Sequence, residues 1–322
     1  MQTEATNKIA EDVALVDVRK VFRSDLLRGP QVALEKLTCR FPAGRCTGLL
    51  GHNGAGKTTT IKLILGLLKP DAGNITIGGS QISLEQKRLI GYMPEVNKLP
   101  AALTAREVLL FQLRMFAPEF AAKAAAKRGA VEAALAAVEL GEHADKLVGN
   151  LSKGMARRLA WAQATIHQPR VLILDEPASG LDPLACRQML DWIRAEKLRG
   201  TTIILCTHEL AQLVTLCHQY HILRRGKLVV SGSLGPNSAQ QYIVHVSGLR
   251  ADGLERLAEC EGLPPWRQLR QEGVLAELSF VGYEHSAHWL QTLLAHGYVV
   301  THFGEDARAF EENLLQHFAG GT

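Results

Sequence analysis

The feature that most constrains this chain is the glycine-rich loop Gly51–Thr58, which reads Gly-His-Asn-Gly-Ala-Gly-Lys-Thr and matches GxxxxGK[ST]. Residues 46–50 before it are an apolar run typical of a buried strand, and residues 58–68 after it are apolar at helical spacing. In that context the glycines let backbone N–H groups curl around phosphates, and the helix N-terminus adds its dipole. The loop therefore predicts a site in which Lys57 pairs with the β and γ phosphates of a nucleotide and Thr58 binds Mg²⁺.

A second feature is the apolar run Val171–Leu174, which ends in the carboxylates Asp175 and Glu176. A strand this apolar is buried on both faces, so its carboxyl end opens at the sheet edge where ligands bind. Beside a phosphate loop, Asp175 is suited to hold Mg²⁺ through its water shell, and Glu176 to polarise the attacking water. Standing alone, the run would also fit a strand that ends in a solvated acidic turn.

The segment Leu151–Met155, Leu-Ser-Lys-Gly-Met, precedes a predicted helix over residues 156–166. Ser152 and the N–H groups around Gly154 therefore lie at a helix N-terminus, where anions are stabilised. By itself this pattern describes only a capped helix. Its position between the glycine-rich loop and the acidic strand favours an anion-binding role.

The order of elements predicts an α/β fold. Residues 13–18, 32–41 and 73–79 have strand character, and residues 104–168 are helical throughout. After Pro169, strands and helices alternate: strand 171–174, helix 183–198, strand 202–206 and helix 209–217. Such a series implies a mainly parallel sheet covered by helices.

The stretch Gly232–Asn237 is the clearest linker, and it predicts domains over residues 10–235 and 240–322. The elements expected in the second are strand 242–247, helix 251–260, a hairpin over 266–280, helix 285–296, strand 297–303 and helix 307–318. This βαββαβ order fits a small ferredoxin-like α+β domain.

The composition, 47% hydrophobic and 21% charged residues, is typical of a packed globular protein. The net charge of +4 is too small and too dispersed to indicate nucleic acid as a partner. The cysteines show no CxxC spacing, the first residues lack an apolar h-region, and no apolar stretch approaches the roughly 20 residues that span a bilayer. We therefore expect reduced thiols in a cytoplasmic protein that a partner brings to any membrane it serves.

Taken together, these motifs resemble those of ABC transporter ATP-binding subunits over roughly residues 12–232. The loop Gly51–Thr58 resembles Walker A, Val171–Glu176 resembles Walker B with its catalytic glutamate, and Leu151–Met155 resembles the signature loop. The resemblance implies a P-loop NTPase (RecA-like) core with an antiparallel β subdomain and an all-helical subdomain over about residues 96–168.

The same resemblance implies ATP and Mg²⁺ as cofactors. Ser179–Asp182 resembles the D-loop, His208 the switch histidine, and Phe22 stands where the family places an aromatic on adenine. The implied catalytic residues are Glu176, His208 and Lys57, and the implied Mg²⁺ ligands are Thr58, Asp175 and Glu95. The implied nucleotide contacts are Phe22, Gly51, Asn53, Gly54, Ala55, Gly56, Lys57, Thr58, Thr59, Glu95, Ser152, Gly154 and Asp182.

Two motifs depart from the family pattern. Lys153 and Met155 replace a glycine and the glutamine of LSGGQ, and Glu95 replaces the Q-loop glutamine. A carboxylate at position 95 can still meet Mg²⁺ and water, but it adds negative charge beside the γ-phosphate. Both variants resemble exporter-type, ABC-2-like subunits, including drug-resistance, sodium-extrusion and nitrous-oxide-reductase-maturation ATPases.

The resemblance implies a homodimer packed head to tail, in which Ser152 and Gly154 of one copy complete the γ-phosphate site of the other. It also implies an integral membrane permease as partner, gripped through Leu99, Pro100 and Leu103, at the cytoplasmic face of the membrane. The expectation of export rather than import rests on the two variant motifs. The C-terminal domain is expected to stabilise the dimer or regulate it, with docking of a substrate or accessory protein as the alternative.

Other classes fit less well. Translation-type ABC ATPases carry two cassettes in one chain, chromosome-type members insert a long coiled coil, and excision-repair types carry zinc cysteines. Here a single cassette is present, and fewer than a hundred residues separate Gly56 from Ser152. A stand-alone GTPase or kinase would lack the signature loop and the switch histidine. A metal site at Cys206 with His208, or at Cys217-His218 with His221, is disfavoured by the alternation of these residues along a strand and a helix end, and by the phosphate role of His208.

Overall fold

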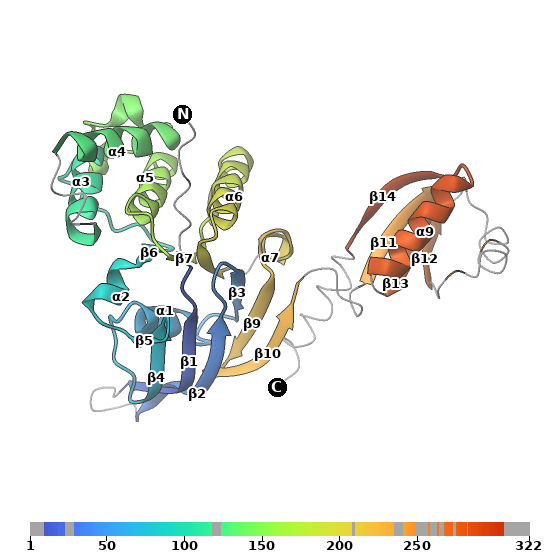
Figure 1. Ribbon diagram of the computed structural model, residues 1–322, viewed down its shortest axis with the longest axis horizontal. Coiled ribbons are helices and arrows are strands. Elements are labelled where there is room, and N and C mark those ends of the chain that lie inside the picture. The colour runs from blue at the N-terminus through green and yellow to red at the C-terminus, as the bar shows by residue number, and fades with distance from the viewer. Residues whose placement is uncertain are drawn as a thin grey trace. The chain divides into compact units, whose positions relative to one another are not determined.

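The structure of the protein is a computed structural model that describes residues 10–22, 29–117, 124–207, 210–234, 241–248, 257, 263, 267–272, 275–281 and 283–305. The chain divides into two compact units, Met1–Gly232 and Ser233–Thr322. This boundary falls at the start of the predicted linker. Figure 1 shows the elements of both units.

The first unit is built on a six-stranded sheet with the order β10-β9-β3-β8-β7-β6. Its strands are β3 (Cys46–Leu50), β6 (Ile90–Met93), β7 (Val171–Asp175), β8 (Thr202–Cys206), β9 (Gln219–Arg224) and β10 (Lys227–Ser233). The pairs β6·β7, β7·β8, β8·β3 and β3·β9 are parallel. Every residue of β3, β7 and β8 is buried, as expected for apolar strands covered on both faces. The mainly parallel sheet predicted from the sequence is confirmed.

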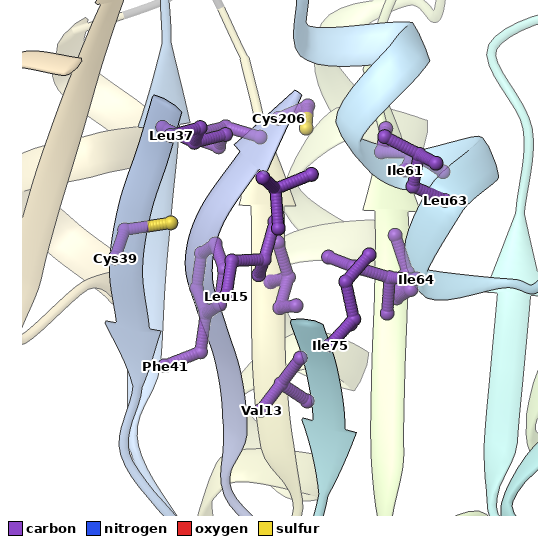
Figure 2. Close-up of a cluster of buried hydrophobic side chains, with 14 of the residues drawn as sticks. Val13, Leu15, Leu37, Cys39, Phe41, Ile61, Leu63, Ile64, Ile75 and Cys206 are labelled. Atoms are coloured by element: carbon purple, nitrogen blue, oxygen red, sulfur yellow. The ribbon is translucent and has the colours of Figure 1, made fainter. Parts of the chain in front are cut away.

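An antiparallel sheet with the order β2-β1-β4-β5 packs beside it. Its strands are β1 (Val13–Phe22), β2 (Gln31–Phe41), β4 (Ala72–Ile77) and β5 (Ser80–Gln81). In Figure 2 side chains from β1, β2 and β4, among them Leu15, Phe41 and Ile75, face Ile61 and Ile64. These two isoleucines belong to α1 (Lys57–Ile64), the helix that follows the glycine-rich loop. The core therefore packs α1 against both sheets.

Helix α1 is shorter than the helix predicted over residues 58–68, so the predicted end of this helix was wrong. Gly66 adopts φ 62°, its N–H donates to the carbonyl of Leu63, and the N–H of Leu67 donates to the carbonyl of Lys62, each at 2.9 Å. This is the Schellman arrangement, in which a glycine in the left-handed region ends a helix. The apolar spacing continued beyond Gly66, so periodicity alone overestimated the length.

The described part of the segment between β6 and β7 consists of helices and turns, with one isolated antiparallel bridge between Thr104 and Leu147, and Figure 1 shows α3, α4 and α5 gathered together. Its helices are α3 (Ala105–Phe116), α4 (Ala124–Ala137), two 3-10 turns at Gly141–His143 and Val148–Asn150, and α5 (Lys153–Thr165). Thr104 and Glu107 form the predicted capping box of α3. Among the residues that the structure describes, no helix combines the length and the apolar character needed to cross a membrane.

Two further helices follow the predicted positions, α6 (Pro183–Leu198) and α7 (Leu210–Leu216). Elements that the sequence analysis did not name are α2 (Leu84–Arg88), β5, β6, β9 and β10. Of these, α2, β5 and β6 have two to five residues, too few for a hydrophobic period to be recognised, and β9 places Gln219, His221 and Arg224 among its apolar residues, unlike the apolar runs of β7 and β8. The fifth, β10, has alternating burial but leaves every side chain at least partly exposed at the sheet edge.

The second unit contains an antiparallel sheet with the order β12-β13-β11-β14. Its described elements are β11 (Gln241–Ser247), β12 (Arg267–Glu272), β13 (Leu275–Val281), α9 (Tyr283–Ala295) and β14 (Val299–Glu305). A separate core of Val244, Val246, Leu278, Phe280, Trp289 and Leu293 joins the sheet to α9. The strand order is the one a βαββαβ unit requires. Apart from Leu257, the predicted helices 251–260 and 307–318 lie outside the described residues, so the ferredoxin-like assignment stays a prediction.

Candidate functional site

The two chemical motifs meet at one edge of the six-stranded sheet. In the register of the parallel strands, Cys206 at the end of β8 pairs with Leu49 of β3 on one side and with Asp175 of β7 on the other. The loop after Leu50 and the carboxylates after Leu174 therefore leave the sheet at the same level, on either side of β8. The sequence predicted this meeting, because the carboxyl ends of parallel strands share one edge.

The glycine-rich loop is held tightly by its neighbours. A Cβ at Gly51 would lie 2.5 Å from the carbonyl oxygen of Leu223 on β9, and one at Gly56 would lie 2.8 Å from Cδ2 of Leu34 on β2. Gly56 has φ 110° and forms the N-cap of α1, so glycine is required for both its backbone and its packing. The loop is thereby fixed with its N–H groups at the start of a helix, where an anion is stabilised.

The side chain of Lys57 folds back onto the carbonyl groups of this loop. Its ammonium donates to the carbonyl oxygen of Gly51, and it also reaches the carbonyl of His52 at 3.4 Å. Burial raises the pKa of Asp175, and the charge of the Lys57 ammonium opposes that rise, so the two charged groups interact at this edge of the sheet. A cation enclosed by loop carbonyls and facing a carboxylate is well placed to bind phosphate oxygens.

Carboxylates crowd this edge. Asp175 is 8% exposed and Glu176 is 9% exposed, while Glu95, on the segment after β6, is exposed. Burial, followed by the negative charges of Glu95 and Glu176, raises the pKa of Asp175 to about 6, and Lys57 and Arg157 oppose this rise. Carboxylate oxygens are ligands that Mg²⁺ prefers, so this excess of negative charge fits a divalent cation.

The backbone of Glu176 is strained. Its φ is 48°, a left-handed conformation that is uncommon for a residue other than glycine. Its N–H donates to the carbonyl of Cys206 at 2.9 Å, and its own carbonyl accepts from Arg157. Neighbouring elements thus hold the catalytic candidate on both sides, as expected where strain persists at functional sites.

Arg157 is the functional candidate that the sequence analysis missed. It lies on α5, is 4% exposed, and donates hydrogen bonds both to the end of β7 and to the segment after β6. Burial lowers its pKa, whereas the charges of Asp175, Glu95 and Glu176 raise it. A signal was present in the sequence. Arg157 occupies the same helix face as the buried residues Ala160, Trp161 and Ala164, at spacings of three, four and seven.

The signature segment forms the predicted helix start. Ser152 is the N-cap of α5, and its hydroxyl accepts from the N–H of Met155 at 3.2 Å. Gly154 differs from Gly51 and Gly56 of the phosphate loop, because a Cβ at Gly154 would meet no atom within 4 Å. Nothing packed in the described part of this chain requires a glycine at that position. The space beside this helix end is open to an external ligand.

Other predicted site residues have local roles. The carboxylate of Asp182 is the N-cap of α6 and accepts from the N–H groups of Leu184 and Ala185 at 3.0 and 2.9 Å. Phe22 ends β1 and is 40% exposed, with the Lys20 ammonium 6.0 Å from its ring centre. His208 follows β8 but lies outside the described residues, so its role stays a prediction.

Cys217, His218 and His221, which were considered for metal binding, have other partners. Cys46 and Cys217 lie with their Sγ atoms 3.6 Å apart, and burial raises the pKa of the Cys217 thiol well above its usual range. His218 accepts from the N–H of Cys46 at 3.0 Å, and His221 bonds to Ser231. Because metals bind thiolates, a buried neutral thiol is a poor ligand.

Comparisons with known proteins agree with this geometry. A family profile described as ABC transporter matches residues 34–179. The Nod factor export ATP-binding protein I of Burkholderia orbicola is 38% identical over 224 residues, which cover 69% of this chain and 71% of that protein. The bacitracin transport ATP-binding protein BcrA of Bacillus licheniformis is 39% identical over 205 residues, covering 62% of this chain and 65% of that protein.

A solved structure of an ATP-binding subunit of an ABC transporter matches with a TM-score of 0.61 and 30% identity. The match covers 69% of this chain and 90% of the solved one. The chain spans about two thirds of the length of the curated relatives it matches. On these grounds, together with the site geometry, the chain belongs to the ABC transporter family and has the P-loop NTPase fold of its ATP-binding subunits.

Proposed function

We propose that this chain binds MgATP at the loop Gly51–Thr58 and hydrolyses it in a head-to-tail sandwich with a second copy, energising a separate membrane permease. The observation that carries the proposal is the meeting of the Lys57 loop with Asp175 and Glu176 at the ends of β3 and β7. The relatives named as export and transport ATP-binding proteins support transport over a ribosomal, DNA-bound or GTPase role.

In the proposed site, Lys57 leaves the carbonyl of Gly51 to bind the β and γ phosphates. Thr58, at the start of α1, and Asp175 would hold Mg²⁺, and Glu95 would contact it through water. The metal supplies positive charge that offsets the charge of the phosphates. Glu176 orients the attacking water and accepts its proton, while His208 stabilises the γ-phosphate. Phe22 would stack on the adenine.

The second copy completes the site. The open space at Gly154, on a helix N-terminus capped by Ser152, supports binding of a phosphate that another chain carries. Asp182 would link the two sites across the dimer. This arrangement explains a glycine that the packing of its own chain does not require.

Export is the direction we propose, on the named relatives and the variant residues Lys153, Met155 and Glu95. The permease would contact the loop residues Leu99, Pro100 and Leu103 at the cytoplasmic face of the membrane. Co-purification from detergent extract with a polytopic membrane protein tests this partner, and purification alone under those conditions would contradict it.

The second unit, with its own core around Trp289 and Phe280, is proposed to stabilise the dimer or regulate it. An independent core supports a separable role, because such a unit keeps its fold when its attachment changes. Deletion of the residues after Pro236 would then alter dimerisation or the ATPase rate. Unchanged values for both would favour docking of an accessory protein instead.

Asp175→Asn tests the metal role through two readouts of opposite sign. The pKa of Asp175 in the folded chain is raised to about 6 by burial and by Glu95 and Glu176, so folding disfavours its ionised form. In EDTA at pH 8, we expect Asn at this position to raise the free energy of unfolding by about 2 kcal/mol. The gain should fade as the pH falls through 6 towards 4, where Asp175 is protonated in the folded state and increasingly in the unfolded state.

With Mg²⁺ and ATP present, the same variant should lose hydrolysis, because the metal loses its anionic ligand. Denaturant unfolding followed with and without EDTA, together with an ATPase assay, measures both effects. Wild-type hydrolysis in Asp175→Asn would contradict the metal assignment. A loss of stability in EDTA would contradict the crowded-carboxylate account.

A further inference from the structure

The contacts of Arg157 extend to both sides of the nucleotide site. We propose that Arg157 is a positioning residue that locks the Glu95 segment to the backbone of Asp175 and Glu176, and so couples the site of its own chain to the signature end of α5. The inference rests on the proposed function and adds a communication route between the two halves of the ATP sandwich.

The guanidinium contacts two segments that are far apart in the sequence. Towards the segment after β6, Nη1 donates to the carbonyls of Pro94 and Glu95 at 2.6 and 2.8 Å, and to Oδ1 of Asn97 at 3.2 Å. Towards the end of β7, Nε donates to the carbonyl of Pro177 at 2.9 Å, and Nη2 donates to the carbonyls of Asp175 and Glu176. One side chain therefore joins the segment after β6 to the backbone of Asp175, Glu176 and Pro177.

An arginine is specifically suited to this junction. Its planar head presents five N–H donors in a fixed fork, so it satisfies carbonyls on two sides at once. A lysine carries the same charge on a single nitrogen, and from this position it would serve one segment and leave the other unbound. The junction therefore depends on the shape of the guanidinium and not only on its charge.

Because Arg157 is buried, its hydrogen bonds to the two segments are expected to form or break as a set. Arg157 is 4% exposed, and its acceptors include five backbone carbonyls and one amide oxygen. A buried cation that loses such partners is left uncompensated, which is strongly unfavourable. If the Glu95 segment moves relative to β7, the guanidinium must exchange one complete set of acceptors for another. Such a contact has two arrangements rather than a continuous range.

The signature end of the same helix lies close by. Ser152 precedes Arg157 by five residues, which in an α-helix is a rise of about 7.5 Å. A helix of this length moves as a rigid body, so a displacement at Ser152 reaches Arg157. When Ser152 and Gly154 contact the partner's nucleotide, the position of Arg157, and through it Glu95 and Glu176, changes with them. The carboxylates become aligned for hydrolysis only when the partner has ATP in place.

The test compares Arg157→Lys and Arg157→Met with the matched control Arg158→Met in the full chain. Arg158 is the next residue of α5, but its guanidinium pairs with Glu139 at 2.6 Å, on the helical side of the molecule. We expect both Arg157 variants to lower kcat by about 10- to 100-fold, because misplacement of catalytic groups by about 1 Å has effects of this size. The KM for ATP and the affinity for MgATP should change by less than about threefold, since Lys57 and the phosphate loop are untouched.

Arg157→Lys separates geometry from charge. A rate for Arg157→Lys near that of the wild type would overturn the proposal, because charge alone would then suffice. Equal kcat values for Arg157→Met and Arg158→Met would also overturn it. Absence of hydrolysis in the wild-type chain would refute the proposed function instead, so the two failures are distinguishable.

Two milder variants, at Asn97, test the same junction if the Arg157 variants fail to fold. Asn97→Ala removes one acceptor on the Glu95 side, whereas Asn97→Asp keeps an oxygen at the same place and adds charge that favours Arg157. We expect Asn97→Ala to lower kcat several-fold and to speed amide hydrogen exchange over residues 95–97, with Asn97→Asp close to the wild type in both. Equal kcat and exchange rates for the two Asn97 variants would contradict the junction.

Discussion

Glu176→Gln is expected to lower the turnover of MgATP by at least about 100-fold, because it removes the carboxylate that accepts a proton from the attacking water. The change keeps the size of the side chain and leaves its backbone contacts with Cys206 and Arg157 in place. Nucleotide affinity should therefore persist, and ATP should accumulate unhydrolysed in the site. Steady-state hydrolysis and equilibrium binding of MgATP measure the two effects separately.

Glu142→Gln provides a control for this variant. Glu142 is an exposed carboxylate in the 3-10 turn Gly141–His143, remote in sequence from the sheet edge, and its change should leave turnover unaltered. Hydrolysis by Glu176→Gln at the wild-type rate, with binding intact, would show that another group acts as the base. A parallel loss of binding would instead mean that Glu176 shapes the nucleotide pocket.

Gly154→Asp is the second variant with a large expected effect, and its two readouts have opposite signs. In the chain itself the substitution is favourable. Space for a Cβ is open, glycine is a poor helix former, and a negative charge near a helix N-terminus gains about 0.3–1 kcal/mol. In the dimer, the new carboxylate would repel the partner's γ-phosphate, which the helix N-terminus otherwise attracts. We expect hydrolysis to fall by about 100-fold or more while stability is kept or raised.

Gly129→Asp is the matched control for this experiment. Gly129 is likewise a helical glycine at which an added Cβ would meet no atom within 4 Å, but it lies in α4, away from the signature end of α5. Its change should leave hydrolysis at the wild-type level. Equal rates of ATP hydrolysis for Gly154→Asp and Gly129→Asp would contradict a phosphate-binding role for Gly154. Unfolding of Gly154→Asp would show that the glycine has a structural role.

The main features of the site were predictable from the sequence because they rest on local rules. The glycine pattern before α1, the apolar strand ending at Asp175, and Ser152 as an N-cap each follow from short-range geometry. Their meeting at one edge follows from the parallel order of the strands. These are properties of consecutive residues and of sheet topology, and the structure confirms them.

The contacts of Arg157 were not predictable in the same way. They join residues on three segments that are separated by 18 to 63 positions along the chain, and their acceptors are mostly backbone carbonyls, which have no side-chain signature. The end of α1 before Gly66 was missed because Leu68 continued the apolar pattern past the helix. The strand β6 was missed because it has only four residues, and β9 was missed because Gln219, His221 and Arg224 interrupt its apolar pattern.

The central claim is that one nucleotide lies between the phosphate loop of one copy and the signature helix end of another, and cross-linking of mixed copies tests it directly. One population carries Asn53→Cys and the other carries Lys153→Cys, both in Glu176→Gln chains with Cys186 and Cys260 changed to serine. Adding MgATP and a short thiol cross-linker to the mixture should give a covalent dimer, with little product from either population alone or without nucleotide. Absence of that dimer in a mixture that binds ATP would contradict the account.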